Sequence, residues 1–192
     1  MWSPLKLLSG MATVAAFAAC SDSPVPVVDA SESMLDARLF GTWVALENES
    51  ADVARITVYP FDEQQMVAQI VGLESIDGAY ELESTLFRVL LAEIDGTNWI
   101  SATELSSEPE PDIESRDERA WAIARLDFEA DGVILFREVS HEIELDGIET
   151  VEGLQAVLVD RQDEQGFLDD EGIRFVRYDG VSTRYPTTAV VF

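Results

Sequence analysis

The sequence predicts a mainly β domain, either an antiparallel small β-barrel or a sandwich, with one C-terminal helix packed on it. Short apolar segments rich in β-branched and aromatic residues follow one another closely between residues 41 and 139. Five Asp-Gly pairs, a dipeptide that favours tight hairpin turns, punctuate the chain. Apolar residues then recur at helical spacing after residue 149. Strands joined by hairpins and followed by a single helix are therefore expected.

The apolar segments give the expected strands, and the Asp-Gly pairs at Asp95 and Asp131 each lie between two of them. The expected strands are 41–46, 55–60, 66–71, 80–94, 98–105, 119–129, 133–139, 142–145, 173–178 and 187–192. The segment 80–94 is long enough for a bulge or bend to be expected within it.

Period-two alternation is clearest in the segment 119–129. One face of this strand is expected to belong to the core, and it carries Ala122, Ala124, Leu126 and Phe128. The other face carries Arg125, Asp127 and Glu129 together with two apolar residues, so it is expected to be mostly solvated.

The helix is expected over residues 149–160. Asp146 or Thr150 can cap its start, and acidic residues at 149 and 152 suit the positive end of the helix dipole. A single helical turn is expected at 35–40, directly before the first strand of the domain.

The first 19 residues have the layout of a secretory signal peptide. Lys6 supplies a positive charge, residues 7–19 are apolar or small, and Ala18 and Ala19 precede Cys20. This apolar run is shorter than the roughly 20 residues that a membrane-spanning helix requires. We expect residues 1–19 to be removed. The alternative is a plain signal peptide, or a signal anchor, that is followed by an incidental cysteine.

Phe17-Ala18-Ala19-Cys20 resembles the lipobox of bacterial lipoproteins, although the family usually has Leu at the position of Phe17. In that family the cysteine becomes the lipid-modified first residue of the mature chain. An Asp directly after the cysteine retains many members in the inner membrane, and this chain has Ser21 there. The resemblance implies a protein in the cell envelope, held in the outer membrane by lipid on Cys20 and facing the periplasm.

Residues 21–33 contain several serines and two prolines and predict a flexible tether. We therefore expect three parts: a signal peptide at 1–19, the lipidated cysteine and tether at 20–34, and a single β-rich domain at 35–192. Hydrophobic residues make up 47% of the chain, and their regular recurrence excludes a disordered protein.

The chain is strongly acidic. After Cys20 it has 11 arginines, no lysine and 38 acidic residues, a net charge of −27. Such a surface repels phosphate backbones and anionic lipid headgroups, so no nucleic-acid partner is expected and attachment to a membrane must be covalent.

The residues that could carry catalysis are few. His141 is the only histidine, and the neighbouring Ser140 would point to the opposite face of a strand. We expect no catalytic residues, no cofactor and no metal, and hence no enzyme. The segments 169–172 and 106–119 offer carboxylates to calcium, but they lack the spacing of an EF-hand, and solvated turns are the better interpretation.

Gly41-Thr42-Trp43 resembles the Gly-x-Trp motif that opens the first strand of lipocalins, where a short turn of helix precedes it and the Trp closes one end of the barrel. The order of strands, helix and closing strand is also similar. The resemblance implies a lipocalin-like small β-barrel with Trp43 packed on Leu35 and Leu39. Arg137 or Arg177 could be the family's late arginine, and its Thr-Asp-Tyr-like turn is not recognisable.

The leading expectation is a non-enzymatic binder of an apolar small molecule or lipid. Trp43, Ala122 and Ala124 are the expected ligand-binding residues. Small inward-facing residues would leave the interior unfilled: Ala45, Ala68, Ala122 and Ala124. An apolar cavity of at least about 300 Å³ is expected to open near 106–119. The alternative is a structural or accessory protein that docks on another envelope component through a sheet edge or that acidic loop.

Overall fold

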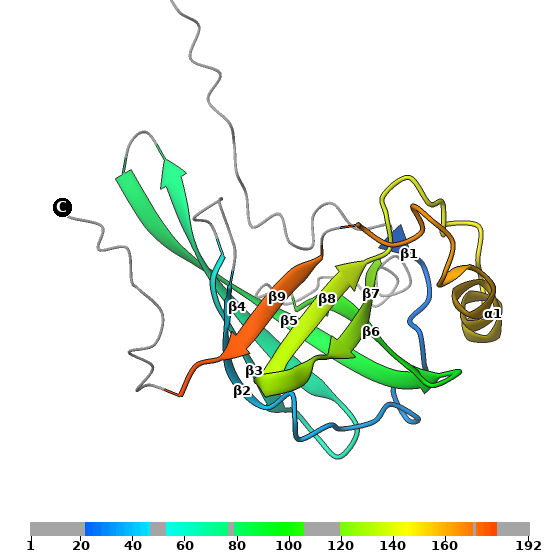
Figure 1. Cartoon of the computed structure of the whole chain (residues 1–192), viewed down its shortest axis with the longest axis horizontal. Coiled ribbons are helices and arrows are strands. Elements are labelled where there is room, and N and C mark those ends of the chain that lie inside the picture. Colours follow the sequence, from blue (N-terminus) through cyan, green and yellow to red (C-terminus); the bar gives the residue numbers. More distant parts are fainter. Residues whose placement is uncertain (1–21, 47–52, 77–78, 106–119, 171, 180–192) are drawn as a thin grey trace, which may run out of the picture.

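A computed structural model describes residues 22–46, 53–76, 79–105, 120–170 and 172–179. It shows an eight-stranded antiparallel β-barrel with one helix against its wall (Figure 1). The eight barrel strands are β2 (Gly41–Ala45), β3 (Val53–Pro60), β4 (Met66–Ile76), β5 (Ala79–Ile94), β6 (Thr97–Glu104), β7 (Trp121–Phe128), β8 (Val133–Glu138) and β9 (Ile173–Arg177). A ninth, short strand, β1 (Asp22–Ser23), pairs with β7 only in the described part of the chain. The helix α1 spans Val151–Arg161.

The barrel is built by a meander from β2 to β8 and closed by β9. Each strand from β2 to β8 pairs with the next one along the chain, and β9 pairs antiparallel with both β8 and β2. The sheet therefore has no edge between β8 and β2, which excludes the sandwich alternative. The segment 142–145, expected to be the eighth strand, is not a strand, and the eighth barrel strand comes after the helix.

The Asp95-Gly96 turn connects β5 and β6 as predicted. Asp95 has a φ of 50° and Gly96 a φ of 75°, the left-handed conformation that a two-residue hairpin turn requires. The connection at Asp131 is also a hairpin, but it uses a short 3-10 turn, Ala130–Gly132. The expected strand 187–192 and the Asp-Gly pair at Asp77 lie outside the described residues.

The long strand β5 contains no bulge. Its 16 residues keep one continuous register with β4 and another with β6, so the expected bulge is absent. The length arises because residues 79–89 of β5 pair with β4 and residues 87–94 pair with β6. A strand shared in this way between neighbours at different heights produces the stagger that closes a barrel.

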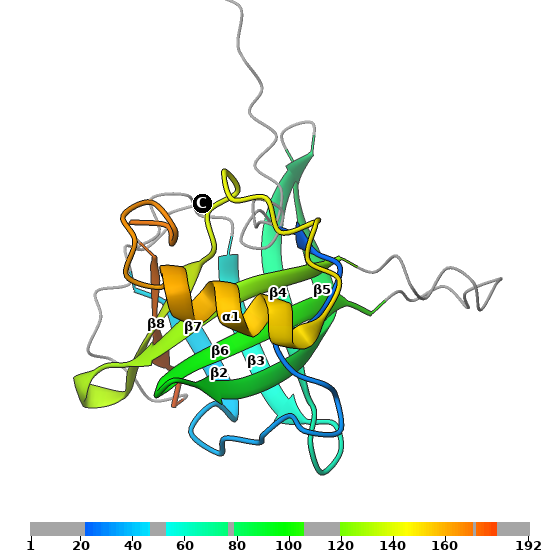
Figure 2. The ribbon, with the colours of Figure 1, turned by 90° about the vertical axis from the view of Figure 1, so that its right-hand side faces the viewer.

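The helix begins and is capped as the sequence predicts. Thr150 is the N-cap, and its Oγ1 accepts a hydrogen bond of 3.1 Å from the backbone N–H of Gly153. Figure 2 shows α1 lying across the outside of the barrel wall. Its buried residues, Leu154 and Leu158, belong to a second core that packs on the outer face of β5, β6 and β7.

This second core corrects the expectation that one face of β7 is mostly solvated. Trp121 and Ile123 are buried under the helix and the N-terminal segment. The same face is polar only further along the strand, where Arg125 and Asp127 form an ion pair. The wall formed by β5, β6 and β7 is therefore covered on both sides.

The prediction that residues 21–33 form a flexible tether is wrong from Asp22 onward. Asp22–Ser23 forms β1 on the edge of β7, and Val27 and Val28 are buried in the second core. The backbone N–H of Val27 donates to Ser101 Oγ at 3.3 Å, and Gln155 Nε2 donates to its carbonyl at 2.8 Å. Burial of two valines and satisfied backbone groups outweigh the linker-like composition of this segment.

Candidate ligand site inside the barrel

The interior of the barrel holds one continuous apolar core. Alternate residues of the eight strands point inward, as period-two side-chain direction requires. Within this core lies a cavity of about 80 Å³. Its lining is entirely apolar: Leu39, Trp43, Ile56, Val58, Met66, Ala68, Val89, Ile100, Leu126, Ile134, Phe136 and Phe175. Among the described residues, the lining offers no nucleophile, acid or base.

Trp43 forms one wall of the cavity and is held from two sides. Its Nε1 donates a hydrogen bond of 2.7 Å to the carbonyl of Leu39. The guanidinium of Arg177 lies over the indole, with its carbon 4.9 Å from the ring centroid, and Nη2 donates to the carbonyl of Arg38 at 2.6 Å. The turn before β2 is thereby tied to the last barrel strand.

Gly41 supplies the backbone conformation at the start of β2. Its φ of 125° is a conformation that residues with a side chain rarely adopt, whereas a Cβ there would lie at an ordinary contact distance of 3.6 Å from Arg177 Nη1. The glycine of the Gly-Thr-Trp motif therefore has a backbone role next to the arginine that covers the tryptophan.

Arg38 contributes through its side chain as well as its carbonyl. Its guanidinium lies 3.8 Å from the centroid of the Phe128 ring and forms an ion pair of 2.5 Å with Asp36. The hydrogen bond from Arg38 holds the pKa of Asp36 below its ordinary value. This contribution to stability is present above the ordinary carboxyl pKa and is lost as the pH falls through the lowered one.

The expected packing partners of Trp43 are half right. Leu39 is buried in the same cluster and lines the cavity, while Leu35 is 36% exposed. The turn is formed at residues 37–39 by an i to i+3 hydrogen bond from the N–H of Leu39 to the carbonyl of Asp36. Leu35 lies before this turn.

The three expected ligand-binding residues occupy different places. Trp43 lines the cavity, and Ala124 belongs to the surrounding core without lining it. Ala122 is buried but pairs with β1 and β6 away from the cavity. Among the small residues expected to leave space, Ala68 is the one that lines the cavity. Sequence reasoning missed most of the other lining residues, and alternation along β8 and β9 was the signal for three of them, Ile134, Phe136 and Phe175.

The cavity is much smaller than the 300 Å³ expected. Large side chains occupy much of the interior, in particular Met66, Phe136 and Phe175. The loop 106–119, beside which the cavity was expected to open, lies outside the described residues. A volume of 80 Å³ is roughly half that of an engineered dry cavity that binds benzene.

His141 and the described residues of the acidic segment 169–172, also singled out from the sequence, do not line this cavity. His141 is exposed beside a buried Ser140. No three His, Cys, Asp or Glu side chains come together as a metal site in the part that the structure describes. No helix among the described residues is both long and apolar enough to cross a membrane. Cys20 lies outside the described residues.

Fold and site define a closed antiparallel β-barrel with an apolar interior and a tryptophan and arginine at its closure. No protein-family model matches the chain, and neither a curated protein nor a solved structure matches it.

We predict that Trp43→Ala lowers the free energy of unfolding by about 3–5 kcal/mol, because it removes a buried aromatic side chain and leaves a cavity. Arg177→Met, which keeps an apolar stem but loses the hydrogen bond and the charge over the ring, should lower it by about 1–3 kcal/mol. Chemical denaturation of both single variants and the double variant measures the coupling. Strictly additive losses would show that the two side chains do not act together.

Proposed function

We propose that the protein is a lipid-anchored envelope protein with a lipocalin-like barrel that binds a small apolar molecule without transforming it. The observation that carries the proposal is the wholly apolar cavity inside a closed barrel, with Trp43 in its wall. A barrel of eight strands encloses just enough space for side chains or for one small ligand. The space left here favours a ligand of few atoms.

The lipocalin-like part of the proposal is supported by the surroundings of Trp43. The Gly-Thr-Trp motif, the turn before it and an arginine over the indole lie together, and Arg177 is the arginine. Arg137, the other candidate, lies on the outer face of the barrel. The chain differs from the layout expected from the family in placing its helix between the seventh and eighth barrel strands.

Met66 is the flexible side chain among the residues that line the cavity. It is fully buried, lines the cavity and has an unbranched, flexible side chain. A ligand as long as a lipid chain would need side chains of the lining to move, because the cavity measures about 80 Å³ and typical ligand pockets measure about 300–1,000 Å³.

The signal-like segment and Cys20 support the lipid anchor. Ser21, in place of an Asp after the cysteine, supports a location in the outer membrane. The packing of Asp22 onto β7 adds a geometric consequence. Ser21 is the one residue between Cys20 and Asp22, the first residue of β1. The Cα atoms of Cys20 and Asp22 are therefore at most about 7.6 Å apart. An anchor on Cys20 would hold the β1 side of the barrel directly at the membrane surface.

Cys20→Ser should release the protein from the membrane, because the serine cannot carry the thioether-linked lipid. Fractionation of cells that express the natural and the serine form is the measurement, with Ser21→Ala as a matched control that should stay bound. A serine form that stays with the membrane would contradict the anchor.

Ala68→Leu should abolish binding of an apolar probe, because the added side chain fills the cavity that Ala68 lines. Binding of xenon, a single apolar atom that suits a cavity of about 80 Å³, would be followed by ¹²⁹Xe NMR for the natural protein, the variant and the control Ala156→Leu, an exposed helix position. We expect saturable binding that only Ala68→Leu removes. Equal binding by all three proteins would place the probe elsewhere.

Exposed apolar side chains favour docking as a second function. Phe61, in the turn between β3 and β4, is 68% exposed, and Met34 and Leu35 are also exposed. Gln64 of the same turn donates to the carbonyl of Ser31, which brings this turn beside the N-terminal segment. Co-purification distinguishes the two functions, since an apolar small molecule supports binding and a stoichiometric envelope protein supports docking.

A further inference from the structure

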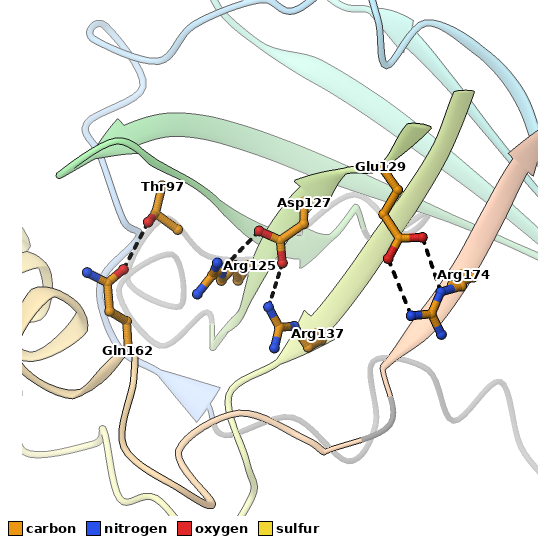
Figure 3. Close-up of polar contacts among 7 residues, drawn as sticks. All are labelled: Thr97, Arg125, Asp127, Glu129, Arg137, Gln162 and Arg174. Atoms are coloured by element: carbon orange, nitrogen blue, oxygen red, sulfur yellow. Dashed lines mark hydrogen bonds and ion pairs between the residues drawn. The ribbon is translucent and has the colours of Figure 1, made fainter. Parts of the chain in front are cut away.

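Two arginines face each other on the outside of the barrel. Arg125 of β7 lies directly opposite Arg137 of β8 in the register of the two strands. Like charges in this position destabilise a sheet. Asp127 lies between them, and its carboxylate accepts from Arg125 Nε at 3.0 Å and from Arg137 Nη2 at 2.6 Å (Figure 3). One carboxylate thus serves two guanidinium groups, which leaves a net charge of about +1.

The pair is half-buried and short of acceptors. The side chains of Arg125 and Arg137 are 21% and 27% exposed. Asp127 is the only acidic side chain among the described residues that pairs with either of them, and Arg137 Nε is buried without a hydrogen bond. One carboxylate cannot accept from all the N–H groups of two guanidiniums, so a ligand that brings acceptors to the N–H groups open to solvent would be stabilised.

A polar pocket of about 350 Å³ opens over this pair. Its volume falls within the range of small-molecule sites. It lies between the β7–β8 wall and the segment that follows α1, and its lining is Arg125, Arg137, Gln162, Asp163, Glu164, Gln165, Gly166, Leu168, Asp169 and Asp170. Thr97 Oγ1 donates to Gln162 Oε1 at 2.9 Å, which fixes the amide at one side of the pocket (Figure 3).

The pocket is divided by charge. The guanidiniums come from the barrel wall, and the carboxylates of Asp163, Asp169 and Asp170 come from the segment after the helix. Glu164 is paired with Arg161, so its charge is balanced. A simple anion would meet these carboxylates as well as the −26 charge of the chain, and a simple cation would meet the arginines. A neutral molecule with both charges avoids both penalties.

We infer that this pocket binds a small zwitterion. The carboxylate of the ligand pairs with Arg125 and Arg137, and its ammonium group faces Asp163, Asp169 and Asp170. The site is distinct from the barrel cavity and does not depend on the apolar ligand proposed for it. Binding weakens with salt, because the pocket is open to solvent on one side.

The test uses three molecules with one carbon chain: 4-aminobutyrate, butyrate and butylammonium. The arginine Nε–Hε signals in ¹⁵N-correlated NMR spectra of the purified protein report on the guanidiniums directly. Glycine and 6-aminohexanoate extend the series to other charge separations. We expect at least one zwitterion to shift the Arg125 and Arg137 signals and to bind at least tenfold more tightly than butyrate. No shift with any of the three zwitterions, or butyrate binding equally well, would overturn the inference.

Variants separate the two halves of the pocket. Arg125→Gln and Arg137→Gln should each abolish the shifts of the remaining pocket arginine, and Arg174→Gln should leave binding unchanged. Arg174 is a matched control because it also lies on the outer face, where it pairs with Glu129 outside the pocket (Figure 3). Loss of binding in the Arg174 variant would contradict the site.

The double variant Asp163→Asn/Asp170→Asn tests the acidic half. Both residues are exposed, so the substitutions preserve the fold. We expect butyrate to bind more tightly and the preference for the zwitterion to fall below about threefold. An unchanged preference would show that the acidic residues do not recognise the ammonium group. Amide spectra of each variant confirm that it is folded.

Discussion

The pairing of β9 with β2 is the constraint on which the rest of the structure depends. Seven strands follow one another as a meander, and the eighth must return past the helix to fill the gap between the first and the seventh. At that seam Trp43 is the register partner of Arg177, whose guanidinium covers the indole and reaches the carbonyl of Arg38. The closed interior, and with it the apolar cavity, exists only while this seam is formed.

Most of the strands could be predicted because their signals are local. Alternation in β7, the turn residues Asp95 and Gly96, and the cap at Thr150 each act within a few residues of chain. Closure could not be predicted in the same way, because the partner of β9 lies about 130 residues earlier in the sequence. The segment 142–145 is not a strand although its apolar residues alternate, because Leu145 packs in the second core with the buried residues of the helix.

The remaining differences arise from packing on the outside and inside of the same wall. Val27 and Val28 were a signal that the N-terminal segment is buried, but proline and serine dominate its composition. Inside the barrel, the position of Ala68 was predictable while the cavity volume was not, because that volume depends on how Met66 and the phenylalanines fill the rest of the interior. A pocket such as that over Arg125 and Arg137 depends on strand register and on the path of the chain after α1.

Hydrogen exchange of the backbone amides of β2 and β9 tests the central claim most directly. If the seam closes the barrel as one cooperative unit, these amides exchange with an opening free energy within about 1 kcal/mol of the most protected amides of β5 and β6. Protection several kcal/mol lower in β9 alone would show that the last strand opens independently. The barrel would then be an open sheet for part of the time, which would contradict the account of a closed apolar interior.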